Sequence, residues 1–342
     1  MKRLIIGPGS MIIYAFIGTL KKFKESGQLE DLKEISCSSS GSIVGMFYVL
    51  TKGNVDDMLK HSLEVPLSEI AKPDVKSLLD KYGLIDSERF EKCISKVAKE
   101  ITGGTDPTFK ELYDMNPIKL HIPTYDLVTN KTVYMSLDTT PNLKVSKAVR
   151  RSISIPVIMS PDDYRYIDGS VAEFSPHVPF LGCTDVFEIR YRSKPKPKKR
   201  AKNLFGYLYD VVSAFLLNRI EYTGFPRFDV YADENFEMFN FSMSIDQKLE
   251  LYRSGYFQVC ERLPVLNRND HASSEECSKN PSCSHECTHD LEDQSEDQHH
   301  LEDGDSGENQ ETLHESQSSA PLEKCQSNLD TFSEISHSDW GQ

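Results

Sequence analysis

The sequence has no apolar run that approaches the roughly 20 residues of a membrane-spanning helix, so we expect no transmembrane segment. Cysteine is also sparse, with eight in 342 residues, four of them in the last 77. Thinly spread cysteines do not indicate a disulfide framework, and they favour a reducing compartment. The net charge of -14 argues against a specific nucleic-acid partner.

The N-terminus has the order of a signal peptide, with Lys2 and Arg3 before the apolar residues 4–18. However, Gly7-Pro8-Gly9-Ser10 interrupts the apolar run. We therefore favour a buried strand over Arg3–Ile6, a glycine-rich turn, and then a helix over Met11–Phe23.

The negative charge is concentrated at the C-terminus. Residues 266–342 hold 19 Asp or Glu and 3 Lys or Arg, and their only aromatic residues are Phe332 and Trp340. Such a segment cannot bury enough apolar surface to offset its chain entropy. We predict one domain over residues 1–265 and a disordered acidic tail over residues 266–342. The alternating Cys and His residues of this tail do not match a zinc pattern, and we expect no metal there.

Short apolar runs alternate with helical patterns, which predicts an α/β fold. A helix is expected over Asp86–Ile101, with Asp86 or Ser87 as its cap, and another over Leu204–Tyr222. Between two of the strands, Asn130 is suited to the left-handed position of a hairpin turn. The strand candidates are Arg3–Ile6, Glu34–Cys37, Ile118–Asp126, Lys131–Leu137, Tyr164–Ile167 and Asp185–Tyr191.

The segment Cys37-Ser38-Ser39-Ser40-Gly41 joins the strand Glu34–Cys37 to a helix-compatible run, Ile43–Leu50. Small residues between a strand and a helix are typical of a nucleophile elbow, which places a serine hydroxyl at a helix N-terminus. Ser39 would be that serine, with Cys37 and Gly41 at the two positions that usually hold glycine. The alternative is a plain serine-rich loop.

Two other kinds of site do not fit this segment. A cysteine-based phosphatase loop needs an arginine six residues after Cys37, where the sequence has Ile43. A serine, histidine and acid triad needs a histidine, and none of His61, His121 and His177 stands in a recognisable motif.

Two further motifs have the residue types of an acyl-transfer site. Gly7-Pro8-Gly9-Ser10 can present backbone N–H groups to an anion. Since Pro8 cannot donate, Gly9 and Ser10 are the expected donors, with Met11 as a third. Ile12 excludes the dinucleotide-binding pattern. Later, Asp168-Gly169-Ser170 places a carboxylate after a predicted strand, although alone it is an ordinary turn.

Together these stretches resemble the patatin-like phospholipases. That family has a glycine-rich oxyanion loop after its first strand, then a G-x-S-x-G elbow, then an Asp-Gly-Gly or Asp-Gly-Ala loop. The flanking runs Ala15–Leu20, Ala148–Pro156 and Ser175–Pro179 are also similar to the family. The resemblance covers about residues 1–240 and does not include the tail.

The resemblance implies a three-layer α/β/α sandwich that hydrolyses fatty-acyl esters of lipids or phospholipids through an acyl-enzyme. It implies that Ser39 is the nucleophile and that Asp168 takes its proton directly, without histidine, metal or cofactor. Ile12 or Ile13 stands where the family has a later glycine. A catalytically inactive lipid-surface or scaffold protein with this fold is therefore the alternative.

A basic stretch begins at the end of the last predicted strand and continues past it, where Pro195 and Pro197 favour an extended loop. It could be a solvated loop, a nuclear-import signal, or a contact with anionic membrane, where each cation contributes about 1 kcal/mol. We expect a cytoplasmic protein with peripheral membrane association, or else a nuclear one. The stretch comprises Arg190, Arg192, Lys194, Lys196, Lys198, Lys199, Arg200 and Lys202.

Overall fold

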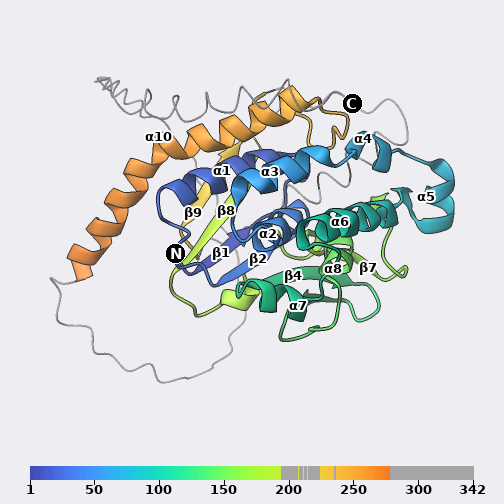
Figure 1. Ribbon diagram of the computed structural model, residues 1–342, viewed down its shortest axis with the longest axis horizontal. Helices are drawn as coiled ribbons and strands as arrows, with labels where there is room; N and C mark the ends of the chain where they lie inside the picture. The colour runs from blue at the N-terminus through green and yellow to red at the C-terminus, as the bar shows by residue number, and fades with distance from the viewer. Residues whose placement is uncertain (194–206, 208–210, 212–213, 215–223, 235, 278–342) are drawn as a thin grey trace, which may run out of the picture. The chain divides into compact units, whose positions relative to one another are not determined.

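The computed structural model describes residues 1–193, 224–234 and 236–277, together with residues 207, 211 and 214 (Figure 1). The chain divides into two compact units, Met1–Val259 and Cys260–Gln342, and the sheets belong to the first. The strands are β1 (Arg3–Ile6), β2 (Glu34–Cys37), β3 (Gly83–Ile85), β4 (Lys119–Asp126), β5 (Lys131–Met135), β6 (Val157–Met159), β7 (Tyr166–Asp168), β8 (Val186–Arg192) and β9 (Arg227–Tyr231). The helices are α1 (Ile13–Glu25), α2 (Ser40–Leu50), α3 (Val55–Glu64), α4 (Leu67–Ile70), α5 (Val75–Lys81), α6 (Ser87–Thr102), α7 (Phe109–Met115), α8 (Val145–Ile153) and α10 (Ile245–Cys277), with short 3-10 turns η1 (Ser10–Ile12), η2 (Gly169–Val171) and η3 (Val178–Phe180).

The predicted α/β fold is confirmed. A mixed sheet has the order β5-β4-β2-β1-β8-β9, and β7 pairs with β4 off this path. The four neighbours β4, β2, β1 and β8 run parallel, as does β9, whereas β5 and β7 are antiparallel to β4. The first two strands have the predicted bounds. Asp86 caps α6 as expected, by accepting the Glu88 N–H.

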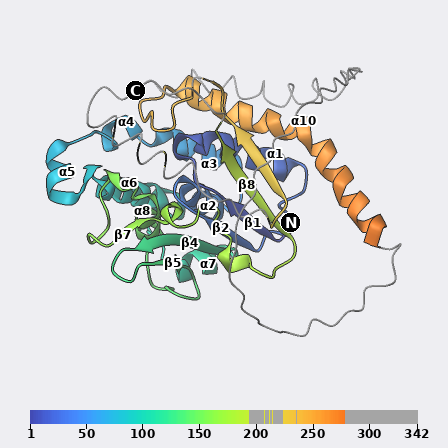
Figure 2. The ribbon, with the colours of Figure 1, turned by 180° about the vertical axis from the view of Figure 1, so that it is seen from behind.

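Helical elements cover both faces of this sheet, which gives the three layers. Helix α1 lies beside β8 (Figure 2). Phe23 of α1 packs edge-on against Phe187 of β8 and Phe228 of β9, each with a centroid distance of 5.6 Å. Val186 precedes Phe187 in β8 and therefore points to the other face. There it packs with Phe180 of η3, which is fully buried. One layer is thus built around α1 and the other around the chain near η3.

Strands β2 and β7 share one edge of β4, because β5 occupies the other edge. On that edge Ser36 lies opposite His121, and Asp168 lies opposite Thr124. These two β4 positions are three residues apart, which is about 10 Å along a strand. Since β2 and β7 run in opposite directions here, their C-terminal ends approach each other. This pairing directs the chain after Cys37 toward Asp168.

The bounds of the other predicted strands agree to within two residues. The strand expected from Tyr164 begins only at Tyr166, because Asp163 and Tyr164 have left-handed φ angles of 56° and 52°. Asn130 has the left-handed φ of 56° expected for the hairpin turn. The small β3–β6 sheet was not predicted, since its two strands have only three residues each, and β9 and α10 were not predicted either.

Some predictions concern residues outside the described ones. The helix expected over Leu204–Tyr222 is one of these, apart from isolated positions. Most of the predicted tail, residues 278–342, is another, so its disorder stays a prediction. Helix α10 itself continues to Cys277, past the boundary that we placed at residue 265. None of the described helices is both long enough and apolar enough to cross a membrane.

Helices α1 and α10 approach each other closely at two glycines. A Cβ atom on Gly18 would overlap the Tyr252 carbonyl of α10, and one on Gly255 would overlap the Ala15 carbonyl of α1. The contact therefore requires residues without side chains on both helices.

We expect Gly18→Ala and Gly255→Ala each to lower the free energy of unfolding by about 1–3 kcal/mol, because overpacking forces the helices apart. Urea denaturation measures this. Arg253→Ala is the matched control, since Arg253 is exposed on the same helix. Equal stability of the Gly18→Ala variant and the wild type would contradict the close packing.

Candidate active site

The chain makes a sharp turn between β2 and α2. Ser39 is the N-cap of α2 and has φ 51° and ψ -131°, a strained conformation for a non-glycine residue. A Cβ atom on Gly41 would lie 2.6 Å from the carbonyl oxygens of both Ile6 and Gly7. Only glycine allows α2 to begin this close to the end of β1.

Cys37, at the first glycine position of the expected elbow, is fully buried. Its Sγ lies 3.8 Å from the His121 carbonyl oxygen. A Cβ atom on Gly45 would lie 2.6 Å from the same sulfur atom. Burial raises the pKa of the Cys37 thiol well above its usual range. The thiol is therefore a small packing group beneath α2 and not a nucleophile.

The first turn of α2 has a backbone donor that was not predicted. The Gly41 N–H donates to the Ser38 carbonyl, and the Ser42 N–H donates to that of Ser39. No acceptor among the described residues takes the N–H of Ser40. An N–H at this position, directly after the serine of an elbow, is a typical oxyanion donor. The order of residues in the elbow could have identified Ser40.

The loop after β1 contributes fewer donors than expected. The Met11 N–H donates to the Met238 carbonyl oxygen at 3.1 Å, so the proposal that Met11 holds an anion is wrong. Within the described part of the chain, the N–H groups of Gly9 and Ser10 have no recorded acceptor. Ser10 has a left-handed φ of 49°. Gly9 and Ser10 are thus the two donors left in this loop.

Both loops open into one pocket with about 430 Å³ of empty space, including its open mouth. Its polar lining comes from Ser10, Ser39 and Ser40. The rest of the lining is apolar, so the pocket suits a hydrocarbon group held beside serine and amide groups. The apolar lining residues are Met11, Ile13, Ile43, Leu67, Phe90, Ile153, Ile155, Met159 and Phe241.

Asp168 is fully buried at the end of β7. Its Oδ1 accepts the Ser170 N–H at 2.8 Å, and its own N–H donates to the Ser154 carbonyl at 2.9 Å. The Ser39 N–H donates to Ser152 Oγ at 3.0 Å. The backbones of Ser39 and Asp168 are thus held by two residues of one short segment, although they are 129 positions apart in the sequence.

None of the three histidines that we considered lines the pocket. Nε2 of His121 lies 3.3 Å from Oε2 of Glu34, at the opposite end of β2 from Ser39. Burial lowers the pKa of His121, which keeps the ring neutral. Nδ1 of His177 lies 2.8 Å from the Ser175 carbonyl. None of these three histidines therefore stands at the pocket with Ser39.

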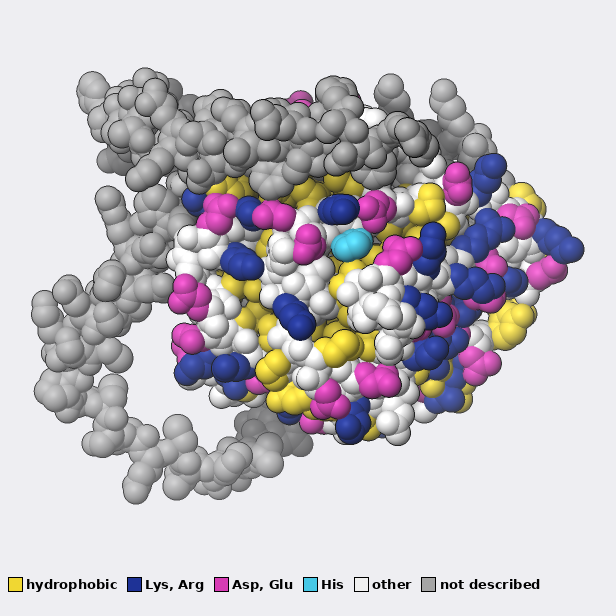
Figure 3. Space-filling view, in the orientation of Figure 1, with side chains coloured by type: hydrophobic (Ala, Val, Ile, Leu, Met, Phe, Trp, Pro, Cys, Tyr) yellow, Lys and Arg dark blue, Asp and Glu magenta, His cyan; other side chains and the backbone are white. Residues whose placement is uncertain are grey.

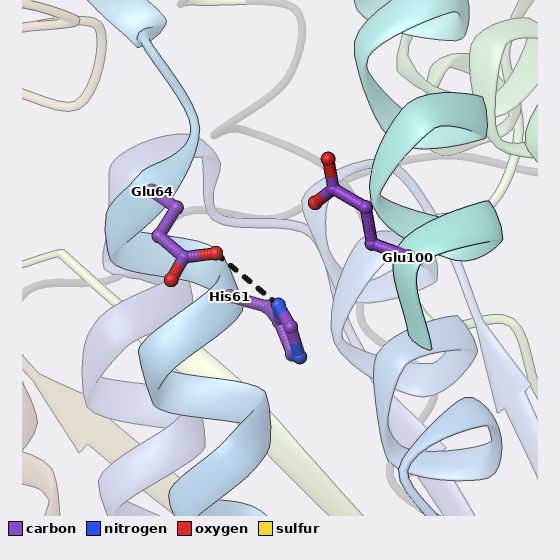
Figure 4. Close-up of side chains that lie close together, drawn as sticks. All are labelled: His61, Glu64 and Glu100. Carbon is purple, nitrogen blue, oxygen red and sulfur yellow. Dashed lines mark hydrogen bonds and ion pairs between the residues drawn. The ribbon is translucent and has the colours of Figure 1, made fainter. Parts of the chain in front are cut away.

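One cluster of potential metal ligands occurs among the described residues. His61 Nδ1 lies 3.3 Å from Glu64 Oε2 on α3, and Glu100 of α6 faces them (Figure 4). Both glutamates are exposed, and Lys96 forms an ion pair with Glu100 at 3.7 Å. None of these side chains lines the pocket.

The predicted membrane contact is wrong for Arg190, the first residue of the basic stretch. Arg190 is fully buried in β8, with its Nε 3.4 Å from Asp229, so it cannot contact a membrane. Arg192 is partly exposed and also pairs with Asp229, at 3.3 Å. The other six basic residues, from Lys194 to Lys202, lie outside the described residues.

Comparison with known proteins gives a match to the family model "Patatin-like phospholipase" over residues 4–181. Among curated proteins, the chain is 29% identical over 165 residues to "Uncharacterized protein R571" of Acanthamoeba polyphaga mimivirus. That alignment covers 47% of the chain and 54% of the viral protein, so the chain spans about half of this relative's length.

Solved structures with a similar fold include VipD from Legionella pneumophila, with a TM-score of 0.51 and 15% identity over 77% of this chain and 67% of VipD. Human GIVD cytosolic phospholipase A2, solved with a fluorophosphonate inhibitor, has a TM-score of 0.42 and 10% identity over 78% of this chain and 58% of that chain. At such low identity, the similarity to VipD concerns the fold alone.

If Ser39 is a nucleophile, Gly41→Ala should slow its covalent labelling by a fluorophosphonate by about 100-fold, because displacing α2 by even 1 Å misaligns its first turn. The rate of covalent labelling measures this. Gly103→Ala is the control: its left-handed φ of 76° makes alanine strained, but nothing lies within 4 Å of the added Cβ. It should lower stability and leave the labelling rate unchanged. Similar labelling rates in both variants would disprove the role of Gly41.

Proposed function

Because the chain belongs to the patatin-like phospholipase family, we propose that it hydrolyses fatty-acyl esters of lipids, with Ser39 as nucleophile and Asp168 as base. One observation carries this proposal. Ser39 occupies a strained strand-to-helix turn that opens, together with the unused amides of Ser10 and Ser40, into an apolar pocket. The shared edge of β4 supports the pairing of Ser39 with Asp168.

The proposed reaction has two steps. Asp168 accepts the proton of the Ser39 hydroxyl while Oγ bonds to the acyl carbon, and the N–H groups of Gly9, Ser10 and Ser40 stabilise the oxyanion. The ester C–O bond then breaks, and the leaving alcohol takes the proton from Asp168. In the second step water attacks the acyl-enzyme and gives its proton to Asp168. The fatty acid leaves, and the proton returns to Ser39. This chemistry requires no metal or cofactor.

We propose that the protein meets its lipid at the periphery of an intracellular membrane. Val75 and Leu79, four residues apart on α5, are 55% and 73% exposed. Tyr82 and Tyr164 lie beside each other, edge to face at 5.3 Å, and both are exposed. Over this region, hydrophobic side chains are interspersed with basic and acidic ones (Figure 3). Exposed tyrosines next to aliphatic side chains suit the boundary between water and lipid.

The alternative function is a catalytically inactive protein that keeps the fold and binds a lipid surface. The hydrogen bond from the Met11 N–H to the Met238 carbonyl favours this alternative, because it leaves the proposed oxyanion loop with one amide donor fewer. Losing one oxyanion donor costs about 10²–10³ in turnover. The N–H of Ser40 can replace this donor, which is why we prefer the active enzyme.

We expect Ser39→Ala and Asp168→Asn each to abolish ester hydrolysis and to leave the fold intact. The double variant should be no worse than either single one, because the two residues act as one unit. Turnover of a short soluble ester and labelling by a fluorophosphonate measure this.

Ser38→Ala is the matched control, since Ser38 is buried next to Ser39. An inactive Ser38→Ala variant beside an active Ser39→Ala variant would move the nucleophile by one residue. A wild type that neither turns over the ester nor reacts with the fluorophosphonate would favour the inactive alternative. If the protein is active, lipid profiling after incubation with mixed phospholipids would identify the substrate.

Binding to vesicles should have one apolar and one electrostatic part. We expect the double variant Val75→Ser and Leu79→Ser to weaken binding by at least about tenfold at any salt concentration, since each aliphatic side chain contributes about 1.5–3 kcal/mol when buried. Replacing Lys194, Lys196 and Lys198 by Gln should weaken binding to anionic vesicles only at low salt.

Cosedimentation with vesicles of phosphatidylcholine and phosphatidylserine measures both effects. Leu181→Ser is the control for the apolar part, because Leu181 is 54% exposed but follows η3, away from α5 in the fold. Hydrolysis of the soluble ester should not change in any of these variants. Equal vesicle binding by the α5 variant and the control would reject the α5 surface.

A further inference from the structure

The end of α8 contacts the backbone of both residues of the proposed dyad. Ser152 Oγ accepts the Ser39 N–H at 3.0 Å, and the Ser154 carbonyl accepts the Asp168 N–H at 2.9 Å. Ile153, between these two serines, lines the pocket. A segment of three residues therefore holds the nucleophile, the base and part of the pocket wall in a fixed relation.

The Ser39 amide needs this contact, because no strand or helix satisfies it. Strand β2 ends at Cys37, and Ser39 precedes the first residue of α2. Ser39 is only 4% exposed, so water does not readily replace the bond. An unpaired buried N–H is costly, and it would add to the strain of the positive φ. The Ser152 hydroxyl thus stabilises the conformation that directs Ser39 into the pocket.

The segment is itself firmly held. Arg151 Nε donates to Asp162 Oδ2 at 2.8 Å, and its guanidinium lies 4.0 Å above the ring of Tyr166 in β7. Lys147, one turn earlier, donates to the other oxygen of Asp162 at 2.6 Å. Asp162 is almost fully buried beneath these two cations. Ser152 is therefore presented to Ser39 from a rigid support.

We propose that Ser152 is a positioning residue, whose hydroxyl holds Ser39 at the backbone angles that bring it to Asp168. This inference rests on the proposed function, since it assumes that Ser39 is the nucleophile. It adds a third side chain on which the reaction depends, besides Ser39 and Asp168. The hydroxyl of Ser152 must accept a hydrogen bond, whereas its contribution to packing is secondary.

The test compares Ser152→Ala with Ser146→Ala. Ser146 is a matched control, because it is also fully buried on α8, where its hydroxyl bonds to Asp106 at 3.0 Å. We expect Ser152→Ala to reduce fluorophosphonate labelling and the kcat for a short soluble ester by about 10- to 100-fold. For an ester whose acylation limits turnover, KM equals the dissociation constant, so it should change by less than about twofold because the pocket lining is kept. Ser146→Ala should lower the melting temperature without slowing the reaction.

Ser152→Thr provides the rescue, because it keeps a hydroxyl at the same position. We expect it to react faster than Ser152→Ala, and it carries the test if Ser152→Ala does not fold. The inference is overturned if Ser152→Ala reacts as fast as Ser146→Ala, or if a folded Ser152→Thr variant reacts at least tenfold more slowly than the wild type. A wild type that the fluorophosphonate does not label would instead overturn the proposed function, and this inference with it.

Discussion

Strand β4 pairs with β2 and with β7 along the same edge, and this pairing determines where the candidate site forms. The two strands run in opposite directions and end near each other, so the chain after each enters the same region. Backbone hydrogen bonds of the sheet thus set the distance between Ser39 and Asp168 before any side chain interacts. Because sheet registers change only in whole residues, a slip of β7 would turn Asp168 to the other face.

The strain at Ser39 has local compensation. Gly41 allows α2 to begin against the carbonyls at the end of β1. The buried hydroxyl of Ser152 accepts a hydrogen bond from the Ser39 N–H, which has no partner within the turn itself. Backbone strain persists only where the surroundings overdetermine it. In this protein the surroundings are two elements, β1 and α8, and both come from the same compact unit.

The sequence predicted the α/β fold and the first two strands because their signals are local: apolar runs bounded by glycine and serine. The expected positions of Gly9, Ser39 and Gly41 at turns rest on the same kind of signal. The pairing of β7 with β4 depends on contacts between distant segments, and no local pattern carries it. The burial of Arg190 was missed for a similar reason, since its partner Asp229 belongs to β9, which was not predicted. The engagement of the Met11 amide by Met238 also joins residues far apart in the chain.

The hydrogen bond between Met11 and Met238 determines when the pocket is completed during protein synthesis. Ser39 and Asp168 leave the ribosome well before Met238, which bonds to the loop after β1, and Phe241, which forms part of the pocket wall. Chains grow at about 5–20 residues per second, so the nascent protein spends several seconds with both proposed catalytic residues present and the pocket open on one side. A nascent chain therefore has no complete lipid-binding pocket until the residues before α10 have been translated.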